Sequence, residues 1–222
     1  MRRPKPRRIA PPDLPAQLET LLLPPERLAP SAELMDVAVS GWDLSGQEVE
    51  SASFDAVVID QANFTGLQAP RLRLRDVRIS KSDCSNARWT HLNADRVEFV
   101  DCRMTGLQSS EAQLSDVRFT RCKADLALFR YAVLHDVRFE ESQLVEADFQ
   151  GADLRGVQFA GCDLTGANLR GAKLEGTDLR GSRLDGLIVN AADLRGALID
   201  GEQTLALAAT FADLLGLVVS DT

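Results

Sequence analysis

Residues 151–181 read GADLRGVQFAGCDLTGANLRGAKLEGTDLRG, and every fifth residue in this stretch is a leucine or a phenylalanine. A small or apolar residue precedes each of these central residues by two places, and a glycine follows each by two places. An amphipathic helix repeats every 3.6 residues and a strand every two, so neither produces a strict period of five. The stretch therefore predicts a five-residue unit that is repeated along the chain.

The same register extends outward in both directions, from Leu34 to Ile199. Of the 34 central positions in this range, only Ser109 is not apolar. The position two before each centre is also apolar or small, and Gln47 is the one clear exception. Eight of the nine phenylalanines are central residues: Phe54, Phe64, Phe99, Phe119, Phe129, Phe139, Phe149 and Phe159. Because the register never slips, we expect one continuous repeat domain over residues 31–201.

The spacing within the unit indicates its geometry. Two inward residues separated by one outward residue are typical of a short β-segment. A glycine two places later supplies the left-handed φ that a tight turn needs. The chain is therefore expected to turn a corner in every unit, and four units close a square coil. The sequence predicts an all-β solenoid, in the form of a four-sided parallel β-helix.

A second period, four units long, supports this geometry. One face carries a column of valines, namely Val37, Val57, Val77, Val97, Val117, Val137 and Val157. The opposite face, two units away, carries small residues instead: Ala62, Ser82, Cys102, Cys122, Ser142, Cys162 and Ser182. The four faces are thus distinct, which a plain five-residue repeat would not require.

Residues 1–30 form a different segment, a proline-rich N-terminal arm with eight of the nine prolines. Such a segment is not expected to hold a strand ladder, and we expect its first dozen residues to be disordered. Leu14–Leu23 is a candidate for a short capping helix. Five basic residues begin the arm, at Arg2, Arg3, Lys5, Arg7 and Arg8. They are interpreted either as a solvated tail or as an electrostatic hook for an anionic partner.

Residues 202–222 form a third segment, in which Thr204–Leu215 is predicted to be a capping helix that ends at Gly216. An open solenoid end needs such a cap. This helix is apolar nearly all round, whereas a helix with one buried face would carry charges on the other. We therefore expect a homodimer through the helix, with the interface residues Leu205, Ala208, Phe211, Ala212 and Leu215. The alternative is that the helix folds wholly onto the coil end of a monomer.

The repeat unit resembles that of the pentapeptide-repeat family, A(D/N)LxG, and the match is best over Gly151–Gly181. Between Leu107 and Gln150 the register persists without glycines. The resemblance implies a right-handed four-sided β-helix. Some members bind DNA gyrase as mimics of duplex DNA, and some dimerise through their C-terminal ends. The resemblance therefore implies a gyrase-binding protein of the quinolone-resistance type as one hypothesis.

Composition and motifs exclude several other functions. The net charge of −8 argues against general binding of nucleic acid by the coil. With no signal-peptide core and no run of 18 apolar residues, we expect a cytoplasmic protein that does not enter a membrane. The two histidines, His91 and His135, fall on outward positions, and the four cysteines show no ligand spacing. We expect no catalytic residues, no cofactor and no metal, and hence no enzyme.

The charge pattern argues against simple mimicry of DNA. Residues 31–60 hold seven acids and no base, whereas residues 71–100 hold seven bases and four acids. The basic group contains Arg73, Arg75, Arg78, Lys81 and Arg88. A duplex mimic needs continuous negative charge along its length.

Four apolar residues occupy outward slots that are usually polar: Leu126, Leu128, Tyr131 and Val133, here called the apolar corner. An exposed apolar cluster often marks a partner site. The alternative is a local bulge that turns these side chains inward. The sequence thus favours a non-enzymatic scaffold for an unidentified protein partner, and gyrase binding is the second hypothesis.

Overall fold

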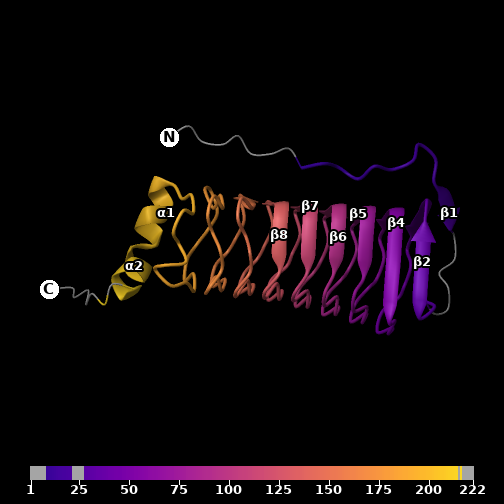
Figure 1. Cartoon of the computed structure of the whole chain (residues 1–222), viewed down its shortest axis with the longest axis horizontal. Helices are drawn as coiled ribbons and strands as arrows, with labels where there is room; N and C mark the ends of the chain where they lie inside the picture. The colour runs from indigo at the N-terminus through magenta and orange to yellow at the C-terminus, as the bar shows by residue number, and fades with distance from the viewer. Residues whose placement is uncertain (1–8, 22–27, 215, 217–222) are drawn as a thin grey trace.

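The computed structural model describes residues 9–21, 28–214 and 216. It is a rod of stacked coils with helices at its C-terminal end (Figure 1). The strands are β1 (Glu19–Leu21), β2 (Ser31–Met35), β3 (Val37–Ser40), β4 (Ser51–Asp60), β5 (Arg73–Ser80), β6 (Asn93–Val100), β7 (Gln113–Thr120), β8 (Val133–Glu140) and β9 (Gln158–Ala160). The helices are α1 (Gly201–Ala206) and α2 (Ala208–Leu214). The predicted fold class, a parallel β-helix with a helical C-terminal cap, is confirmed.

The parallel register is the expected four units, or one coil, on all four faces. Strands β4 to β8 bend around a corner and cover two faces, with pairs such as Val57↔Val77 and Val77↔Val97. Isolated bridges cover the other two faces, for example Asn63↔Asp83 and Gln68↔Arg88. Each coil therefore bonds to the next along its whole perimeter, and the corners keep their positions along the rod.

The interior is built from columns of stacked rings. Phe119 lies between Phe99 and Phe139, with ring-centroid distances of 4.9 and 4.6 Å and nearly parallel planes. A second stack, Phe129 on Phe149 at 5.2 Å, meets the first stack edge-on. These rings are fully or almost fully buried. The inward assignment of the central residues is thus confirmed.

The corners keep a left-handed backbone even where glycine is absent. Among the described residues, 18 that are not glycine have a positive φ, including Leu126 at 59° and Tyr131 at 57°. This conformation costs a residue with a side chain about 1–2 kcal/mol. The hydrogen bonds that each corner makes to the next coil impose it, as when Leu126 N donates to Val145 O at 2.9 Å. The loss of glycines therefore leaves the coil geometry intact.

The N-terminal arm differs from expectation in two ways. The helix predicted within Leu14–Leu23 is wrong: β1 is a strand that pairs in parallel with β3, through Thr20↔Ala38. It forms because residues 16–21 are free of proline and can bond to the open edge of the first coil. The disorder expected for the first dozen residues is also wrong for residues 9–12, which lie against the coil. Residues 1–8, which include the five basic residues of the arm, lie outside the described residues.

The C-terminal cap consists of two short helices, where one was expected. Asp200 caps α1 and forms a capping box with Gln203, so α1 starts earlier than predicted. The helix is interrupted at Leu207, between α1 and α2, and the side chain of Leu207 is fully buried against the core. The side-chain amide of Gln203 donates to Leu179 O and Ser182 O at 2.6 Å each. The cap thus satisfies carbonyl groups that the last coil would leave without partners.

Candidate interaction surface

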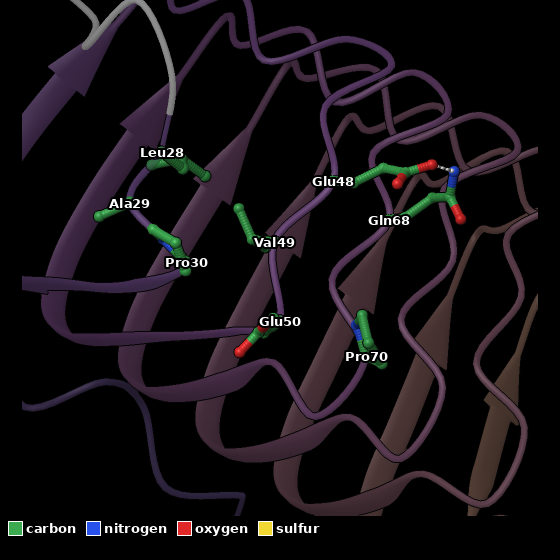
Figure 2. A pocket seen from close by; sticks show the side chains of 8 residues that line it. All are labelled: Leu28, Ala29, Pro30, Glu48, Val49, Glu50, Gln68 and Pro70. Carbon is green, nitrogen blue, oxygen red and sulfur yellow. Dashed lines mark hydrogen bonds between the residues drawn. The ribbon is translucent and has the colours of Figure 1, made fainter.

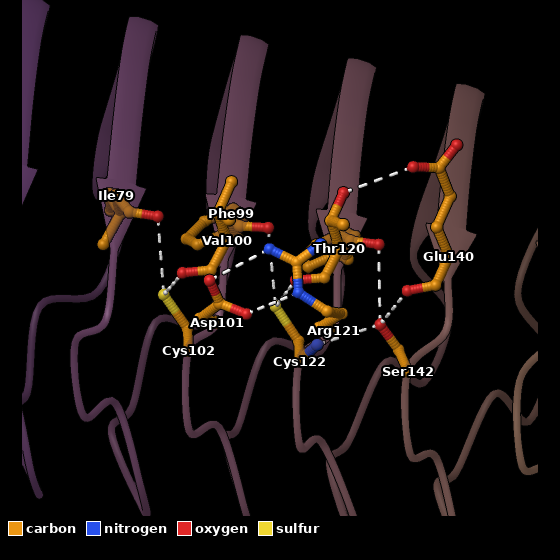
Figure 3. Close-up of polar contacts among 11 residues, drawn as sticks. Ile79, Phe99, Val100, Asp101, Cys102, Thr120, Arg121, Cys122, Glu140 and Ser142 are labelled. Carbon is orange, nitrogen blue, oxygen red and sulfur yellow. Dashed lines mark hydrogen bonds and ion pairs between the residues drawn. The ribbon is translucent and has the colours of Figure 1, made fainter.

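The cysteines fill the interior of the coil, and Figure 3 shows two of them, Cys102 and Cys122, with their polar contacts. All four are buried free thiols. Cys102 and Cys122 lie one coil apart, and each Sγ bonds to a carbonyl, Ile79 O at 3.4 Å and Phe99 O at 3.5 Å. Burial raises the pKa of Cys84, and it raises the pKa of Cys162 to about 11. At Cys102 the hydrogen bond with Cys122 lowers the pKa, whereas a thiol whose pKa is raised by burial, as at Cys84 and Cys162, is a poor nucleophile.

The histidines point outward, as predicted. His91 lies 3.5 Å from Glu111, and His135 lies 3.0 Å from Asp136. In the part of the chain that the structure describes, no group of three or more histidine, cysteine or acidic residues is arranged to hold a metal ion. In that same part, no helix is long and apolar enough to cross a membrane.

A groove near the N-terminal end of the rod has a volume of about 750 Å³ and is shown in Figure 2. Its apolar walls are Leu28, Val49, Pro30 and Pro70. Its polar groups are Glu50 and the bonded pair Glu48 and Gln68, in which Gln68 Nε2 donates to Glu48 Oε1 at 2.5 Å.

The apolar corner is exposed on the coil. Leu126, Tyr131 and Val133 are 51, 60 and 48% exposed, and Leu128 is half-buried. The inward bulge that was the alternative is wrong. Leu126 and Tyr131 keep the regular corner φ, and Leu128 and Val133 keep their bridges to the neighbouring coils. Leu126 and Tyr131 thus stand at successive corners, and Leu128 and Val133 lie on the two faces that meet at Tyr131.

The backbone and neighbouring side chains hold the apolar corner in place. Tyr131 N donates to Gln150 O at 2.9 Å, so the corner is tied to the next coil. The Tyr131 ring lies over Gly151, where an added Cβ would meet it at 2.5 Å. Next to it, Arg130 Nε bonds to Asp148 Oδ2 at 2.6 Å. Such a surface is ordered before any partner binds, which lowers the entropic cost of association.

Three arginines lie on the same columns of the coil as the apolar corner, nearer the N-terminal end of the rod. Arg71, His91, Glu111 and Tyr131 follow one another on one corner, each one coil after the last. Arg71, Arg73 and Arg88 are exposed and form no ion pair within the described residues. The apolar corner therefore lies on one stripe with positive charge, separated from it by one or two coils of polar residues.

Elsewhere on the coil, acids and bases alternate from one coil to the next. Arg121 pairs with Asp101 at 2.7 Å, and the equivalent pairing recurs on other columns. Examples are Arg75 with Asp55, Arg78 with Glu98, Arg96 with Asp76, Lys173 with Asp153 and Arg183 with Asp163. The negative potential of these columns is thus largely neutralised between neighbouring coils.

The residues predicted to form a dimer interface lie on different sides of the cap. Leu205 is 78% exposed and Ala208 is also exposed. Ala212 is buried and Phe211 packs against the coil core. Leu215 lies outside the described residues. The helices of this single chain therefore both cover the coil end and present an apolar residue to solvent.

Square coils of five-residue units define the class of pentapeptide-repeat solenoids. Two family models match the chain: "Pentapeptide repeat region" over residues 92–169, and "Pentapeptide repeats (8 copies)" over residues 162–201. The chain belongs to the pentapeptide-repeat family, as its repeat unit predicted.

Solved structures similar to this chain include two pentapeptide-repeat proteins. QnrB1, a plasmid-mediated fluoroquinolone resistance protein, is 21% identical, with 92% of this chain and 99% of QnrB1 covered and a TM-score of 0.47. HetL, from the cyanobacterium Nostoc sp. strain PCC 7120 and involved in the regulation of heterocyst differentiation, is 20% identical, with 78% and 92% covered and a TM-score of 0.29. A comparison with curated protein sequences finds no significant match.

Sequence reasoning missed several polar residues that position the ends of the rod. Gln203 lies just before the predicted helix Thr204–Leu215 and was given no role, yet it is buried and bonds to the last coil. Gln47 was an exception to the inward pattern, and its Oε1 accepts the N–H of Leu28 at 3.0 Å. A polar residue in an apolar column was the available signal for Gln47. Asp76 and Asp116, which bond to the arm, had no such signal because corners are normally polar.

Proposed function

We propose that this protein is a non-enzymatic scaffold that binds a protein partner through the apolar corner. Pentapeptide-repeat proteins are generally structural or interaction scaffolds. The observation that supports the proposal is the exposure of Leu126, Tyr131 and Val133 at successive positions of one coil turn that is hydrogen-bonded to the next coil. Soluble domains rarely expose such a cluster without a partner.

The surroundings of the apolar corner favour a partner with acidic and apolar groups. Arg71, Arg73 and Arg88 lie on the same stripe, and none of them forms an ion pair in the part of the chain that the structure describes; Glu111 lines the same hollow as Arg71 and Arg73. An acidic group on the partner would pair with these arginines, and an apolar side chain beside it would cover Tyr131. Charge complementarity would then fix the orientation of the partner along the rod.

The test is capture of a partner by immobilised protein, compared between variants. We expect Leu126→Glu and Tyr131→Glu to abolish capture without a change in melting temperature, because glutamate already occupies both columns at Glu146 and Glu111. Met35→Glu is the matched control, because Met35 is 64% exposed but lies outside the corner. A partner that binds all three variants equally would rule out the apolar corner as its site.

Gyrase binding is a second candidate function, supported by the family and by the rod shape of the coil. The ion pairs between coils count against a continuous acidic face. The test is a supercoiling assay with purified gyrase, with and without a quinolone. Supercoiling and quinolone-induced cleavage that are unchanged at micromolar protein would exclude this function for the gyrase tested.

For the assembly of the protein, we propose a homodimer through the C-terminal helices. The support is the exposed Leu205 beside Ala208 on the outer side of the cap. A two-fold contact between two such ends would remove both apolar surfaces from water.

A further inference from the structure

The N-terminal arm lies along one edge of the coil and runs back from β1 beside the stacked strands (Figure 1). Residues 9–15 have no regular secondary structure. Ala10 N donates to Asp116 Oδ1 at 2.8 Å, and Asp13 N donates to Asp76 Oδ1 at 2.7 Å. Ile9 is only 7% exposed. The segment is therefore bound at defined positions along the edge.

The spacing of the two bonds matches an extended proline-rich chain. Asp76 lies in β5 and Asp116 in β7, and both strands pair with β6, so the acceptors are two coils apart. Two strand spacings amount to about 9.6 Å. Ala10 and Asp13 are three residues apart, which in a polyproline II conformation amounts to about 9.3 Å. The two N–H donors, three residues apart, thus meet two acceptors that are two coils apart.

The residues between the two donors fit the coil between the two acceptors. The corner residue of that coil is Arg96, with a φ of 52°, and a guanidinium accepts no hydrogen bond. Pro11 and Pro12 lie between the two donors, and proline has no N–H that needs an acceptor. The edge therefore fits a segment in which two residues with a backbone N–H donor are separated by two prolines.

The acceptors are held in place by the coil itself. Arg96 bonds to both oxygens of Asp76, at 2.7 and 2.5 Å, and its Nη1 lies 2.7 Å from Asp95. Burial by itself raises the pKa of Asp76, but the bonds from Arg96 and from Asp13 N hold that pKa below its usual value. Asp76 is thus a charged acceptor whose orientation is set by Arg96, a residue of the coil.

We propose that this edge, formed by Asp76, Arg96 and Asp116, is a binding site for an extended segment of a partner protein with the pattern apolar-x-Pro-Pro-x. The arm, with Ile9-Ala10-Pro11-Pro12-Asp13, is a built-in competitor for the same site. Its attachment through β1 keeps it at high local concentration. A partner segment gains access by displacing the arm, and the site is separate from the apolar corner.

A labelled peptide of residues 9–16 tests the site in the full-length chain by fluorescence anisotropy. The variant Ala10→Pro removes one of the two donors of the arm and should free the edge. We expect saturable binding of the peptide to this variant, and binding at least tenfold weaker to the parent chain. Adding Asp116→Ala to the variant should abolish binding. Glu111→Ala, an acid in the same coil at another corner, should leave it unchanged.

Hydrogen exchange provides the second measurement in the same full-length proteins. The Ala10 and Asp13 amides should be protected in the parent chain, and Asp116→Ala should lower the protection of Ala10 at least tenfold. Absence of peptide binding to the Ala10→Pro chain would overturn the proposal, as would binding that Asp116→Ala does not change. Persistent protection of Asp13 in Ala10→Pro would also overturn it, because the arm would then not depend on the donor spacing.

Discussion

Phe119 illustrates how a single central residue contributes to the coil. Its ring is stacked on Phe99 and Phe139 and meets Phe129 edge-on. Each ring fills the space between two coils, and the neighbouring rings cannot move to replace it because their own backbones are fixed in the ladder. Loss of one ring therefore leaves a cavity as well as a loss of buried apolar surface.

We expect Phe119→Ala and Phe139→Ala each to lower the free energy of unfolding by about 3–5 kcal/mol, as cavity formation in a packed core does. Chemical denaturation measures the change. Gln113→Ala, an exposed residue in the same coil as Phe119, is the control and should stay within about 0.5 kcal/mol of the parent. A loss below about 1 kcal/mol in both phenylalanine variants would contradict the stacking as a source of stability.

At the corners, the coil imposes a left-handed backbone on residues that do not favour it. Lys81 is an exposed corner residue with a φ of 48°, whereas Lys123 is exposed in the β-ladder. Replacing Lys81 by glycine removes the cost of a left-handed backbone, about 1–2 kcal/mol. The same change at Lys123 adds flexibility to the unfolded chain, at a cost of about 0.5–1 kcal/mol, and removes an exposed ion pair between Lys123 Nζ and Asp125 Oδ2 at 3.6 Å.

We therefore expect Lys81→Gly to raise the free energy of unfolding by about 0.5–1 kcal/mol and Lys123→Gly to lower it by a similar amount. Thermal and chemical unfolding of the two variants, measured side by side, provide the test. If both variants lose stability equally, the corner φ at residue 81 carries no strain.

At the scale of elements, the two ends of the rod are closed by different devices. At the N-terminal end, β1 adds a strand to β3, and Gln47 accepts the N–H of Leu28. At the C-terminal end, α1 and α2 cover the coil, and Gln203 bonds to two carbonyls of the last coil. Both devices occupy the backbone groups that an open sheet edge would otherwise expose.

Gln203→Met keeps the volume of the side chain but removes both donors. We expect a loss of about 1–3 kcal/mol for each carbonyl left buried without a partner. Glu202→Gln, at the exposed neighbouring position, should change stability by less than about 1 kcal/mol. Denaturant unfolding that gives equal midpoints for the two variants would show that solvent replaces the bonds of Gln203.

At the scale of the whole molecule, we propose that the cap joins two chains in a dimer. Light scattering at micromolar concentration should give about twice the chain mass of 24.2 kDa. Leu205→Lys should give the mass of a monomer that is still folded, because Leu205 is exposed and Gln203 still caps the coil. Met35→Lys, at the opposite end of the rod, should leave the dimer intact. A parent chain that stays at 24.2 kDa across concentrations would exclude the dimer.

Sequence alone determined the coil. The positions of Phe119, Val97 and Cys122 follow from the five-residue unit and from the coil of four units, because each inward side chain repeats at a fixed place in a regular ladder. The same register places Leu126 and Tyr131 in outward slots, but it left open an inward bulge, and the structure decided for exposure. Periodicity predicts these features because every unit contacts only its neighbours in the stack.

Tertiary structure alone decided what happens where the period ends. Whether Glu19–Leu21 forms a helix or a strand depends on the open edge of β3, which local sequence does not contain. The hydrogen bond from Ala10 N to Asp116 Oδ1 joins residues that are 106 positions apart in the sequence. The direction of Gln203 likewise depends on carbonyls of the last coil. Such contacts connect a segment without a repeat to a surface that exists only after the coil has formed.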